Sequence, residues 1–379
     1  MKKNQICSFC VMDQSDPEII FLGAKGCNNC HSMLSNLKDN QEIGVSGSEN
    51  LSKTVDKIKR SRKKNEFDSV LGISGGLDSS YMALKCFDWG LQPLLLHVDT
   101  GWNSEVAVRN IQAIIDFTGW KLRTYVLDWN EMRDLHLAYL KSGISNQDVP
   151  QDHAIFSVLY KFASKNNVKY IINGGNTATE GIFPRKWHGS SMDARNLIDI
   201  HRTFGTTKLT KYPISSFLKL YFYYPFIKNI KPIRLLNFIE YDRHLAITEL
   251  ETRTEWKSYP QKHGESNFTR FFQEYFLITR FGIDKRRAHL SSNIVTGQIS
   301  RDKALTILSR LPYEPEALRR DTEYICRKLR ISSEEFNLYL NLPKKNSSDF
   351  KNWEKYYALM KFFQLLGERY LKIKIRMYR

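Results

Sequence analysis

The first half of the chain alternates short apolar runs with longer segments in which apolar residues recur at helical spacing. Apolar runs of four to seven residues are typical of buried strands, and the longer amphipathic segments are typical of helices. We expect strands at residues 70–73, 93–98, 122–127 and 169–172, and helices at 79–89, 104–119 and 154–166. This alternation predicts an α/β fold with a parallel sheet covered by helices, whose ligands lie beyond the carboxyl ends of the strands.

The pattern divides the 379 residues into three predicted parts. Residues 1–45 hold paired cysteines and a polar linker, and residues 46–205 hold the alternating strands and helices. Residues 206–379 lose the alternation, so we expect a mostly helical region that binds substrate or a partner. Within it, the aromatic stretch 217–227 predicts a buried helix or packing surface, with a substrate lid or a membrane-surface contact as alternatives.

Basic residues outnumber acidic ones by 57 to 40, which gives a net charge of +17. Polyanions, nucleotides and acidic lipid surfaces are therefore candidate partners. No run of eighteen apolar residues occurs, and the first residues lack an apolar signal core. We therefore expect a cytoplasmic protein without a transmembrane segment.

Four of the six cysteines form two C-x-x-C pairs near the N-terminus. Two such pairs, separated by a short insert that we expect to be β-rich, are typical of a zinc ribbon. Four sulfur ligands close the coordination shell, so the predicted site is structural. Its ligands would be Cys7, Cys10, Cys27 and Cys30. The other two, Cys86 and Cys326, have no partner in sequence and are expected in the core.

Residues 74–80, directly after the first predicted strand, read Ser-Gly-Gly-Leu-Asp-Ser-Ser. Gly75 and Gly76 let the backbone approach an anion, and the N–H groups of a turn that opens a helix form an anion-binding concavity. Asp78 fits beside a phosphate when a cation lies between them, which indicates Mg²⁺. The predicted hydroxyl donors are Ser74, Ser79 and Ser80.

Two other strand ends carry candidate nucleotide-binding residues. Asp99 ends the second strand, and Gly174 and Gly175 follow the fourth. Paired glycines at a strand end permit the close backbone approach that an adenosine or an activated carbonyl requires. We therefore expect these three residues to face the nucleotide.

The sequence 74–80 differs from the Walker loop, which ends in Gly-Lys-Ser/Thr, and from the dinucleotide pattern G-x-G-x-x-G. It resembles the PP-loop of the ATP pyrophosphatases, a superfamily that includes GMP, NAD and asparagine synthetases and several tRNA-modifying enzymes. This resemblance implies adenylylation of a carbonyl-type oxygen, release of pyrophosphate, and displacement of AMP by a nucleophile.

Residues 262–291 form a second group rich in polar chemistry. Its cations are candidates for contact with ATP phosphates or with the diphosphate of a nucleotide-linked substrate. His263 and Glu265 are candidates for proton transfer when ammonia attacks. Exposed helical charges are the alternative interpretation of this segment.

The cysteine pairs, the loop 74–80, the turn at Gly174 and the segment 262–291 occur together. In this combination the chain resembles the N-acetyl sugar amidotransferase family of bacterial surface-polysaccharide and flagellar-glycan pathways, from residue 7 to about residue 305. The resemblance implies an ATP-dependent conversion of a sugar N-acetyl group, on a sugar that we expect to be nucleotide-linked, into an acetamidino group through an adenylylated intermediate.

The same resemblance implies roles for individual residues and partners. Pyrophosphate would lie on the loop 74–80, and Asp78 would act through Mg²⁺. The other residues carried over as catalytic candidates are Lys262, His263, Lys285 and Arg286. Ammonia would come from a separate glutaminase similar to the histidine-pathway enzyme, with its synthase-like partner.

Two alternatives remain from sequence. A PP-loop tRNA-modifying enzyme, either a thiolase or a lysidine-type ligase, shares the loop, the cysteine pairs and the basic charge. A zinc-ribbon scaffold with a degenerate nucleotide domain would bind without turning over ATP. The sugar hypothesis predicts no bound nucleic acid, which distinguishes it from the first alternative.

Overall fold

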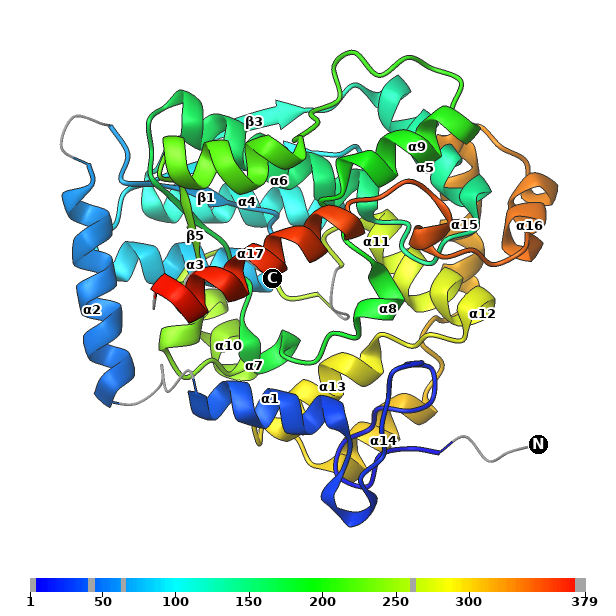
Figure 1. Ribbon diagram of the computed structural model, residues 1–379, viewed down its shortest axis with the longest axis horizontal. Helices are drawn as coiled ribbons and strands as arrows, with labels where there is room; N and C mark the ends of the chain where they lie inside the picture. Colours follow the sequence, from blue (N-terminus) through cyan, green and yellow to red (C-terminus); the bar gives the residue numbers. More distant parts are fainter. Residues whose placement is uncertain (1–4, 40–44, 63–65, 260–263, 372–379) are drawn as a thin grey trace.

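The computed structural model describes residues 5–39, 45–62, 66–259 and 264–371 (Figure 1). In these ranges, five strands form one sheet in the order β3-β2-β1-β4-β5, and every neighbouring pair is parallel. The strands are β1 Ser69–Gly72, β2 Pro93–Asp99, β3 Leu122–Val126, β4 Tyr170–Ile172 and β5 Lys231–Ile233. The predicted α/β fold with a parallel sheet is therefore confirmed.

The strand order reverses at β1. The chain runs outward from β1 through β2 to β3, and then returns to place β4 on the other side of β1. The loops that follow β1 and β4 therefore flank the point where the strand order reverses, and doubly wound sheets bind their ligands in a crevice at this point. The two glycine turns of the sequence analysis are those two loops.

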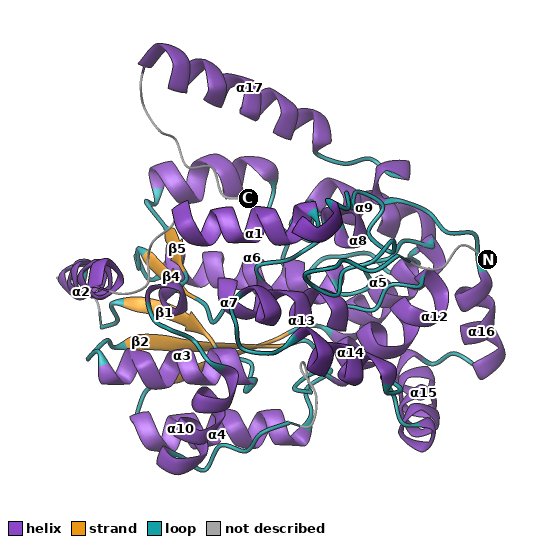
Figure 2. Cartoon of the chain, turned by 90° about the horizontal axis from the view of Figure 1, so that it is seen from below, coloured by secondary structure: helices purple, strands orange, loops and turns teal. Residues whose placement is uncertain are grey.

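Alternate residues of the central strands enter different cores. Val70 and Leu96 face the layer of α6 (Val149–Lys165), whereas Leu71 and Leu95 face α3 (Leu77–Asp88) and α4 (Glu105–Thr118). A period of two follows from strand geometry, and burial of both faces explains why these strands are continuously apolar. Figure 2 shows α3, α4 and α10 (Arg243–Arg253) on one side of the sheet and α6 on the other.

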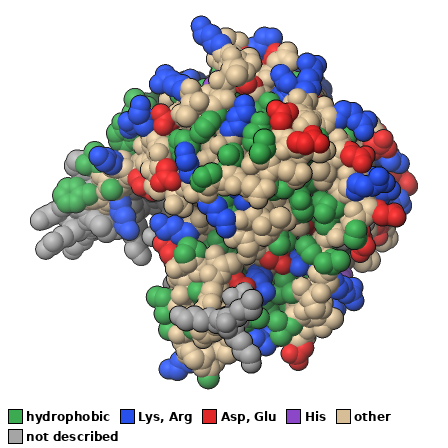
Figure 3. All heavy atoms as spheres, turned by 90° about the vertical axis from the view of Figure 1, so that its right-hand side faces the viewer, with side chains coloured by type: hydrophobic (Ala, Val, Ile, Leu, Met, Phe, Trp, Pro, Cys, Tyr) green, Lys and Arg blue, Asp and Glu red, His purple; other side chains and the backbone are tan. Residues whose placement is uncertain are grey.

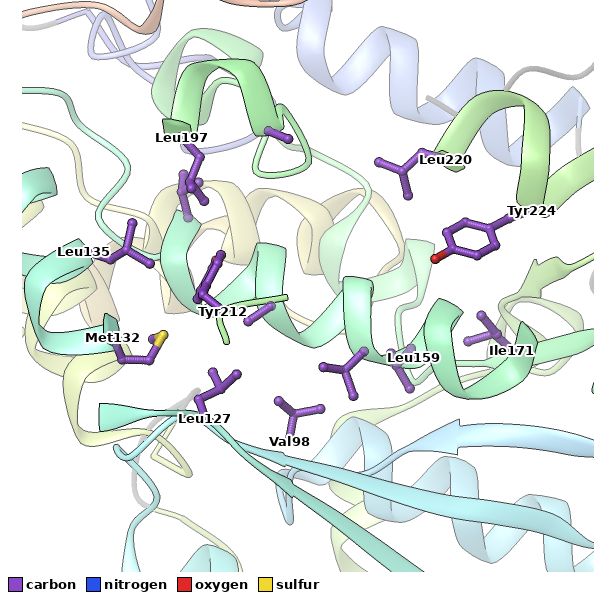
Figure 4. Packing of buried hydrophobic residues seen from close by; sticks show 14 of the residues in the cluster. Val98, Leu127, Met132, Leu135, Leu159, Ile171, Leu197, Tyr212, Leu220 and Tyr224 are labelled. Carbon is purple, nitrogen blue, oxygen red and sulfur yellow. The ribbon is translucent and has the colours of Figure 1, made fainter. Parts of the chain in front are cut away.

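The core beneath α6 includes side chains from distant segments. Leu159 of α6, Val98 of β2 and Leu197 of α9 (Ala194–Phe204) belong to one buried cluster, to which α5 (Trp129–Ser142) contributes Met132 and Leu135 (Figure 4). Leu220 and Tyr224 of the π-helix η2 (Lys219–Ile227) point into this cluster.

Helix α1 (Asn28–Asp39) lies within residues 1–45, where a polar linker was expected, and α2 (Val45–Arg60) follows it. Part of the expected linker is therefore helical. Beyond residue 205 the described chain is mostly helical, as predicted, but it also supplies β5, which the sequence analysis missed. The remaining helices are α7 Thr177–Glu180, α8 Arg185–His188, α11 Asn267–Phe271, α12 Leu277–Phe281, α13 Arg286–Val295, α14 Arg301–Ser309, α15 Pro315–Leu329, α16 Ser333–Asn341 and α17 Glu354–Leu371. The single-turn and π segments are η1 Gly23–Lys25, η3 Leu235–Phe238, η4 Phe272–Phe276 and η5 Ser347–Asp349.

The N-terminal cysteine module docks on α13 and α14, at the bottom of Figure 1. Arg287 pairs with Asp13 at 2.9 Å, and Arg301 donates to the carbonyl of Cys7 at 2.9 Å. In turn, α13 is fastened to α7, because the N–H of Ile182 donates to Ser292 Oγ at 2.9 Å and His289 Nδ1 contacts Thr179 O at 3.2 Å. The module therefore supports, through α13, the helix that follows the Gly174 turn.

A bilayer-spanning helix would have to be longer and more apolar than any helix found in the described ranges.

Candidate active site and cysteine cluster

The loop after β1 has a backbone shape that only glycine permits at one position. Gly75 has φ +78°, and a Cβ there would lie 2.3 Å from the carbonyl oxygen of Ala107 in α4. Its own carbonyl accepts three hydrogen bonds, each of 3.1 Å, from Asn110 Nδ2, Trp256 Nε1 and the Tyr259 hydroxyl. The loop is therefore held from outside by α4 and by the segment that follows α10.

The serines of the loop differ in accessibility. Ser79 Oγ accepts from the Ser74 N–H at 3.2 Å, and Ser74 Oγ accepts from the Gly76 N–H at 3.3 Å, so both hydroxyls lie along the loop. Ser80 is fully buried, and its Oγ has no hydrogen-bond partner among the described residues. Of the three predicted hydroxyl donors, Ser74 and Ser79 are the two that lie along the loop.

The turn after β4 touches the start of α3. A Cβ on Gly174 would lie 2.5 Å from the Asp78 carbonyl oxygen and 2.7 Å from the Ser79 nitrogen. Asn176 Nδ2 donates to Asp78 Oδ1 at 3.5 Å, and the Tyr241 hydroxyl donates to the same oxygen. Burial, together with the Asp78 charge, raises the pKa of Tyr241, so this phenol stays a donor. The Asp78 carboxylate is thereby oriented at the crevice between β1 and β4.

A third strand end contributes a cation that the sequence analysis did not identify. Arg234 directly follows β5 and is exposed, and a Cβ on Gly175 would lie 3.4 Å from Arg234 Nε. The guanidinium therefore lies beside the second glycine of the Gly174 turn. In the sequence, Arg234 is simply a basic residue after a short segment. That segment was not identified as a strand, because it contains Lys231 and Pro232.

Asp99 shapes the turn after β2. Its Oδ1 accepts from the Gly101 N–H at 2.8 Å and from Asn103 Nδ2 at 3.0 Å. Asn103 also donates to His97 Nε2 at 2.9 Å, so His97 Nδ1 carries the proton that it donates to the Ile73 carbonyl at 2.9 Å. This network links the ends of β1 and β2, and the expected contact of Asp99 with nucleotide stays a prediction.

The start of the second polar segment lies directly against the loop. Asn103 and Ser266 form an antiparallel bridge, and the Ser104 N–H donates to the carbonyl of Glu265 at 2.9 Å. A Cβ on Gly76 would lie 2.9 Å from Glu265 Oε1. Burial and the charge of Glu265 both raise the pKa of Tyr259. Glu265 thus adds a second carboxylate at the loop, whereas Lys262 and His263 lie outside the described residues.

A buried polar network extends from the end of β2 to the start of α6. Thr100 Oγ1 donates to Gln151 Oε1 at 2.7 Å, and Gln151 Nε2 donates to Asp148 Oδ1 at 3.1 Å. Asp148 also accepts from Thr269 Oγ1 at 3.1 Å and from Gln273 Nε2 at 3.3 Å. The second polar segment therefore meets α6 beyond the carboxyl ends of the strands.

Lys285 acts on this network electrostatically. Burial and the Asp148 charge raise the pKa of Asp152 to about 7, and the positive charge of Lys285 opposes that rise. Burial lowers the pKa of His188, and Lys285 lowers it further. Lys285 is therefore within electrostatic range of the start of α6. A ligand bound there would lie near a cation, Lys285, and near an acid, Asp152.

Arg286 is committed to other contacts. Its Nε and Nη2 donate to Asp284, with Nη2 at 2.7 Å from Oδ2, and its Nη1 donates to the Arg310 carbonyl at 3.1 Å and the Ile307 carbonyl at 3.4 Å. All of these partners belong to α13's own start or to the end of α14. Through these contacts Arg286 joins the start of α13 to the end of α14. They give no support to its predicted contact with phosphate.

The four paired cysteines converge on one point. Their Sγ atoms all lie within 4.8 Å of one another, and all four residues are buried. A Cβ on Gly26 would lie 2.8 Å from Cys30 Sγ, so glycine is needed there. Hydrogen bonds from Cys10 and Cys27 lower the pKa of the Cys30 thiol despite its burial. Four convergent thiols of this kind fit a tetrahedral zinc site.

The surroundings of the cysteines differ from the expected β-rich insert. The pairs Ile6–Asp13 and Phe21–Cys27 are isolated bridges, and the second cysteine pair opens α1. Cys86 and Cys326 are buried in α3 and α15, as expected for core residues.

Comparison with known proteins gives one family match. Residues 265–364 match the model of a family described as "LPS biosynthesis protein WbpG-like, C-terminal domain". The predicted resemblance to a surface-polysaccharide family is therefore confirmed in this region, which begins at Glu265, the residue that contacts Gly76. No curated protein sequence matches the chain.

Two of the solved structures that are similar to the chain share 13% sequence identity with it. NMN synthetase from Francisella tularensis has a TM-score of 0.31, and the match covers 78% of this chain and 97% of that one. The NH3-dependent NAD synthetase from Campylobacter jejuni subsp. jejuni NCTC 11168, in complex with the nitrate ion, has a TM-score of 0.28 over 78% of this chain and 98% of that one.

Proposed function

We propose that this chain, whose residues 265–364 are similar to the C-terminal domain of WbpG-like LPS biosynthesis proteins, is an ATP-dependent amidotransferase. Its substrate would be a sugar that carries an N-acetyl group, most simply on a nucleotide carrier. The acetamido oxygen attacks the α-phosphorus of ATP, which forms an O-adenylyl imidate and releases pyrophosphate. Ammonia then adds to the imidate carbon, AMP leaves, and an acetamidino group remains.

One observation carries the proposal: the WbpG-like segment and the glycine loop share a site. Glu265 lies against Gly76, at the crevice where the strand order reverses. A domain found in LPS biosynthesis proteins thus contributes a carboxylate to a loop whose glycines and N–H groups suit a diphosphate. A sugar-modifying reaction that releases pyrophosphate accounts for both halves of the site.

The loop would hold the departing diphosphate. The Gly75 carbonyl is tied down by three donors, so the neighbouring N–H groups are fixed before ATP arrives. Preorganised donors stabilise charge that develops in the transition state without the cost of reorganisation. Ser74 and Ser79 border the same loop and would add hydroxyl donors.

Two carboxylates beside the loop 74–80, Asp78 and Glu265, would repel a bound diphosphate unless a cation lies between them. Asp78 is oriented by Tyr241 and Asn176, and Glu265 lies on the other side of Gly76. Carboxylate oxygens are the ligands that Mg²⁺ prefers, and Mg²⁺ commonly bridges carboxylates to substrate phosphates. When bound, the ion would neutralise the diphosphate, so we propose Asp78 and Glu265 as its protein ligands.

The network at the start of α6 would receive the sugar. Thr269, the half-buried member of this network, can hydrogen-bond a sugar hydroxyl, and Lys285 can meet the diphosphate of a nucleotide carrier. Asp152, with a pKa of about 7, can accept a proton from the attacking ammonia near neutral pH. Asp152 was absent from the sequence-based candidates.

The supply of ammonia and the compartment are further parts of the proposal. We infer that a separate glutaminase similar to the histidine-pathway enzyme, with its synthase-like partner, delivers ammonia to this chain. ATP consumption and a cluster of reduced thiols fit a reaction in the cytoplasm. A thiolase is disfavoured, because Cys86, the cysteine of α3, is fully buried and its pKa is raised by that burial.

The test is a reconstituted reaction. Purified chain is mixed with ATP, Mg²⁺, ammonium and a panel of nucleotide-linked acetamido sugars, and mass spectrometry follows the replacement of oxygen by NH. We expect one sugar to give the amidine together with equal amounts of AMP and pyrophosphate. Glu265→Gln should abolish product, whereas Glu105→Gln, an exposed carboxylate at the start of α4, should not. Formation of ADP and phosphate, or no product with any sugar, would contradict the proposal.

A further inference from the structure

A basic cleft of about 250 Å³ lies at the amino-terminal end of the strands, opposite the end that carries the loop 74–80. It lies where β4 and β5 begin, beside the last turn of α2, which both views place next to these strands (Figures 1 and 2). Its lining residues are Lys57, Arg60, Ser61, Lys169, Tyr170, Asn229 and Lys231. Four of the seven are cationic and none is acidic.

The backbone holds the cations of the cleft together. Tyr170 pairs with Lys231 in the parallel ladder, and the Lys231 N–H donates to the Lys169 carbonyl at 2.7 Å. Like charges gathered in this way repel one another, and a bound anion relieves that repulsion. The face in Figure 3, by contrast, intersperses basic and acidic side chains. The cleft therefore suits a phosphate group.

The helix η2 ends two residues before Asn229, which lines the cleft. One side of η2 is apolar and exposed to solvent. Leu220 and Tyr224 point inward (Figure 4), and the Ile230 N–H donates to the Tyr224 carbonyl at 2.8 Å. On the outer side, the exposed fraction is 69% for Phe226 and 73% for Ile227. Leu218 and Phe222 are also exposed, and Lys219 and Lys228 flank them. Single exposed apolar side chains such as Leu311 are common, whereas these four lie within ten residues of one another, and such a group marks a surface that binds something apolar.

We propose that the basic cleft and the outer side of η2 together form a docking face for the surface of a membrane rich in anionic lipid. A lipid headgroup phosphate would occupy the cleft, and Phe226 and Ile227 would enter the boundary between headgroups and acyl chains. Anionic lipid is the partner that offers negative charge and apolar chains side by side. A nucleic acid matches the charge, but aliphatic side chains such as Leu218 and Ile227 provide no stacking platform for its bases.

The docking face leaves the proposed active site free. The cleft lies at the amino ends of β4 and β5, whereas the loop after β1 lies at the carboxyl ends of the same parallel sheet. Attachment to a membrane would therefore present the crevice away from the lipid. This inference does not depend on the reaction proposed above.

The test is co-sedimentation of the full chain with extruded vesicles at physiological ionic strength. Vesicles of phosphatidylcholine alone are compared with vesicles that also contain phosphatidylglycerol. Two double variants are tested, Lys169→Glu with Lys231→Glu and Phe226→Ser with Ile227→Ser. Matched controls carry Lys303→Glu or Leu311→Ser, which alter exposed residues in or beside α14.

We expect the parent chain to bind the vesicles that contain phosphatidylglycerol and not those of phosphatidylcholine alone. Each double variant should lose affinity for the anionic vesicles by about tenfold or more. The controls should bind as the parent chain does, and thermal unfolding should show that all variants fold, because every changed residue is exposed. Three results would overturn the proposal: no binding of the parent chain to anionic vesicles, equal binding by the double variants, or binding of single-stranded RNA that displaces the vesicles and depends on the same lysines.

Discussion

Gly174 and Asp78 are in direct backbone contact: a Cβ on the glycine would lie 2.5 Å from the aspartate's carbonyl oxygen. The contact joins the turn after β4 to the first turn of α3, so it fixes the width of the crevice between them. Neither backbone can yield without moving a helix or a strand. The two glycine motifs of the sequence are therefore two halves of one structure.

This contact predicts the effect of Gly174→Ala. Forcing a methyl group into so short a distance should lower the free energy of unfolding by about 1–3 kcal/mol and misplace Asp78. We expect ATP-dependent pyrophosphate release to fall sharply, measured beside urea unfolding. The control is Gly119→Ala, where φ is +68° but no atom lies within 4 Å. That variant should lose about 1 kcal/mol of stability and keep its activity. Full activity in Gly174→Ala would show that the contact does not position the site.

Asp78→Asn tests the cation at the loop. The amide keeps the size of the side chain and its place beside Tyr241, but it removes the charge that would hold Mg²⁺. Pyrophosphate release should fall by about a hundredfold or more, with unfolding unchanged. Asp116→Asn, at an exposed position of α4, should have no effect on either measurement. Normal turnover in Asp78→Asn would remove this residue from the mechanism.

Cys7→Ser tests the cysteine cluster. Structural zinc contributes on the order of 10 kcal/mol of binding free energy to folding, so losing one ligand should lower stability by about 3 kcal/mol or more. Bound zinc, measured by elemental analysis, should fall in parallel, and a strong chelator should reproduce the effect in the parent chain. Cys86→Ser changes a buried cysteine outside the cluster and should retain the metal. A zinc-free Cys7→Ser chain with an unchanged melting temperature would contradict the structural role.

Asp152 predicts a pH dependence of stability. Its folded pKa of about 7 lies above the ordinary aspartate value of about 4, so the folded state binds a proton that the unfolded state has released between these values. Stability should therefore fall as pH rises from about 4 to about 7, and level off above that range. Asp152→Asn should weaken this slope in urea unfolding. Glu274, whose pKa burial also raises to about 7, leaves a residual slope in that variant. Identical slopes in the variant and the parent chain would exclude the assignment.

The sequence predicted β1, β2 and β4 because each contains a short run of consecutive apolar residues next to glycine or polar turns, and it also predicted β3, which is more polar and more exposed. It missed α5 because its buried faces include Glu131 and Asp134, whose polarity resembles that of a loop. Glu131 accepts hydrogen bonds from the Lys211 and Tyr212 N–H groups, and these partners lie about eighty residues away in the chain. Periodicity carries no information on such distant partners.

The site was predictable in part for the same reason. The loop 74–80 has a local spacing that is typical of one chemistry, so Gly75, Gly76 and Asp78 were identified from sequence as candidates. The contact of Glu265 with Gly76 depends on the bridge between Asn103 and Ser266, which no local pattern predicts. Arg286 shows the opposite limit of sequence reasoning, because a cation near a predicted site can equally pair with its neighbour Asp284, and its contact with phosphate stays a prediction.

Arg234 provides the test of a residue that only the structure identified. It follows β5 and lies beside Gly175, so its guanidinium borders the crevice from the side opposite α4. A charge-assisted hydrogen bond to a phosphate contributes about 1.5–3 kcal/mol, which corresponds to at least a tenfold change in binding. Arg234→Gln should therefore raise the KM for ATP or for the sugar by about tenfold or more, whereas kcat changes little. Arg234→Lys should recover part of the loss, and Arg319→Gln, an exposed arginine of α15, should be neutral. If both KM values stay unchanged in Arg234→Gln, the end of β5 takes no part in binding, and the crevice is limited to the loops after β1, β2 and β4.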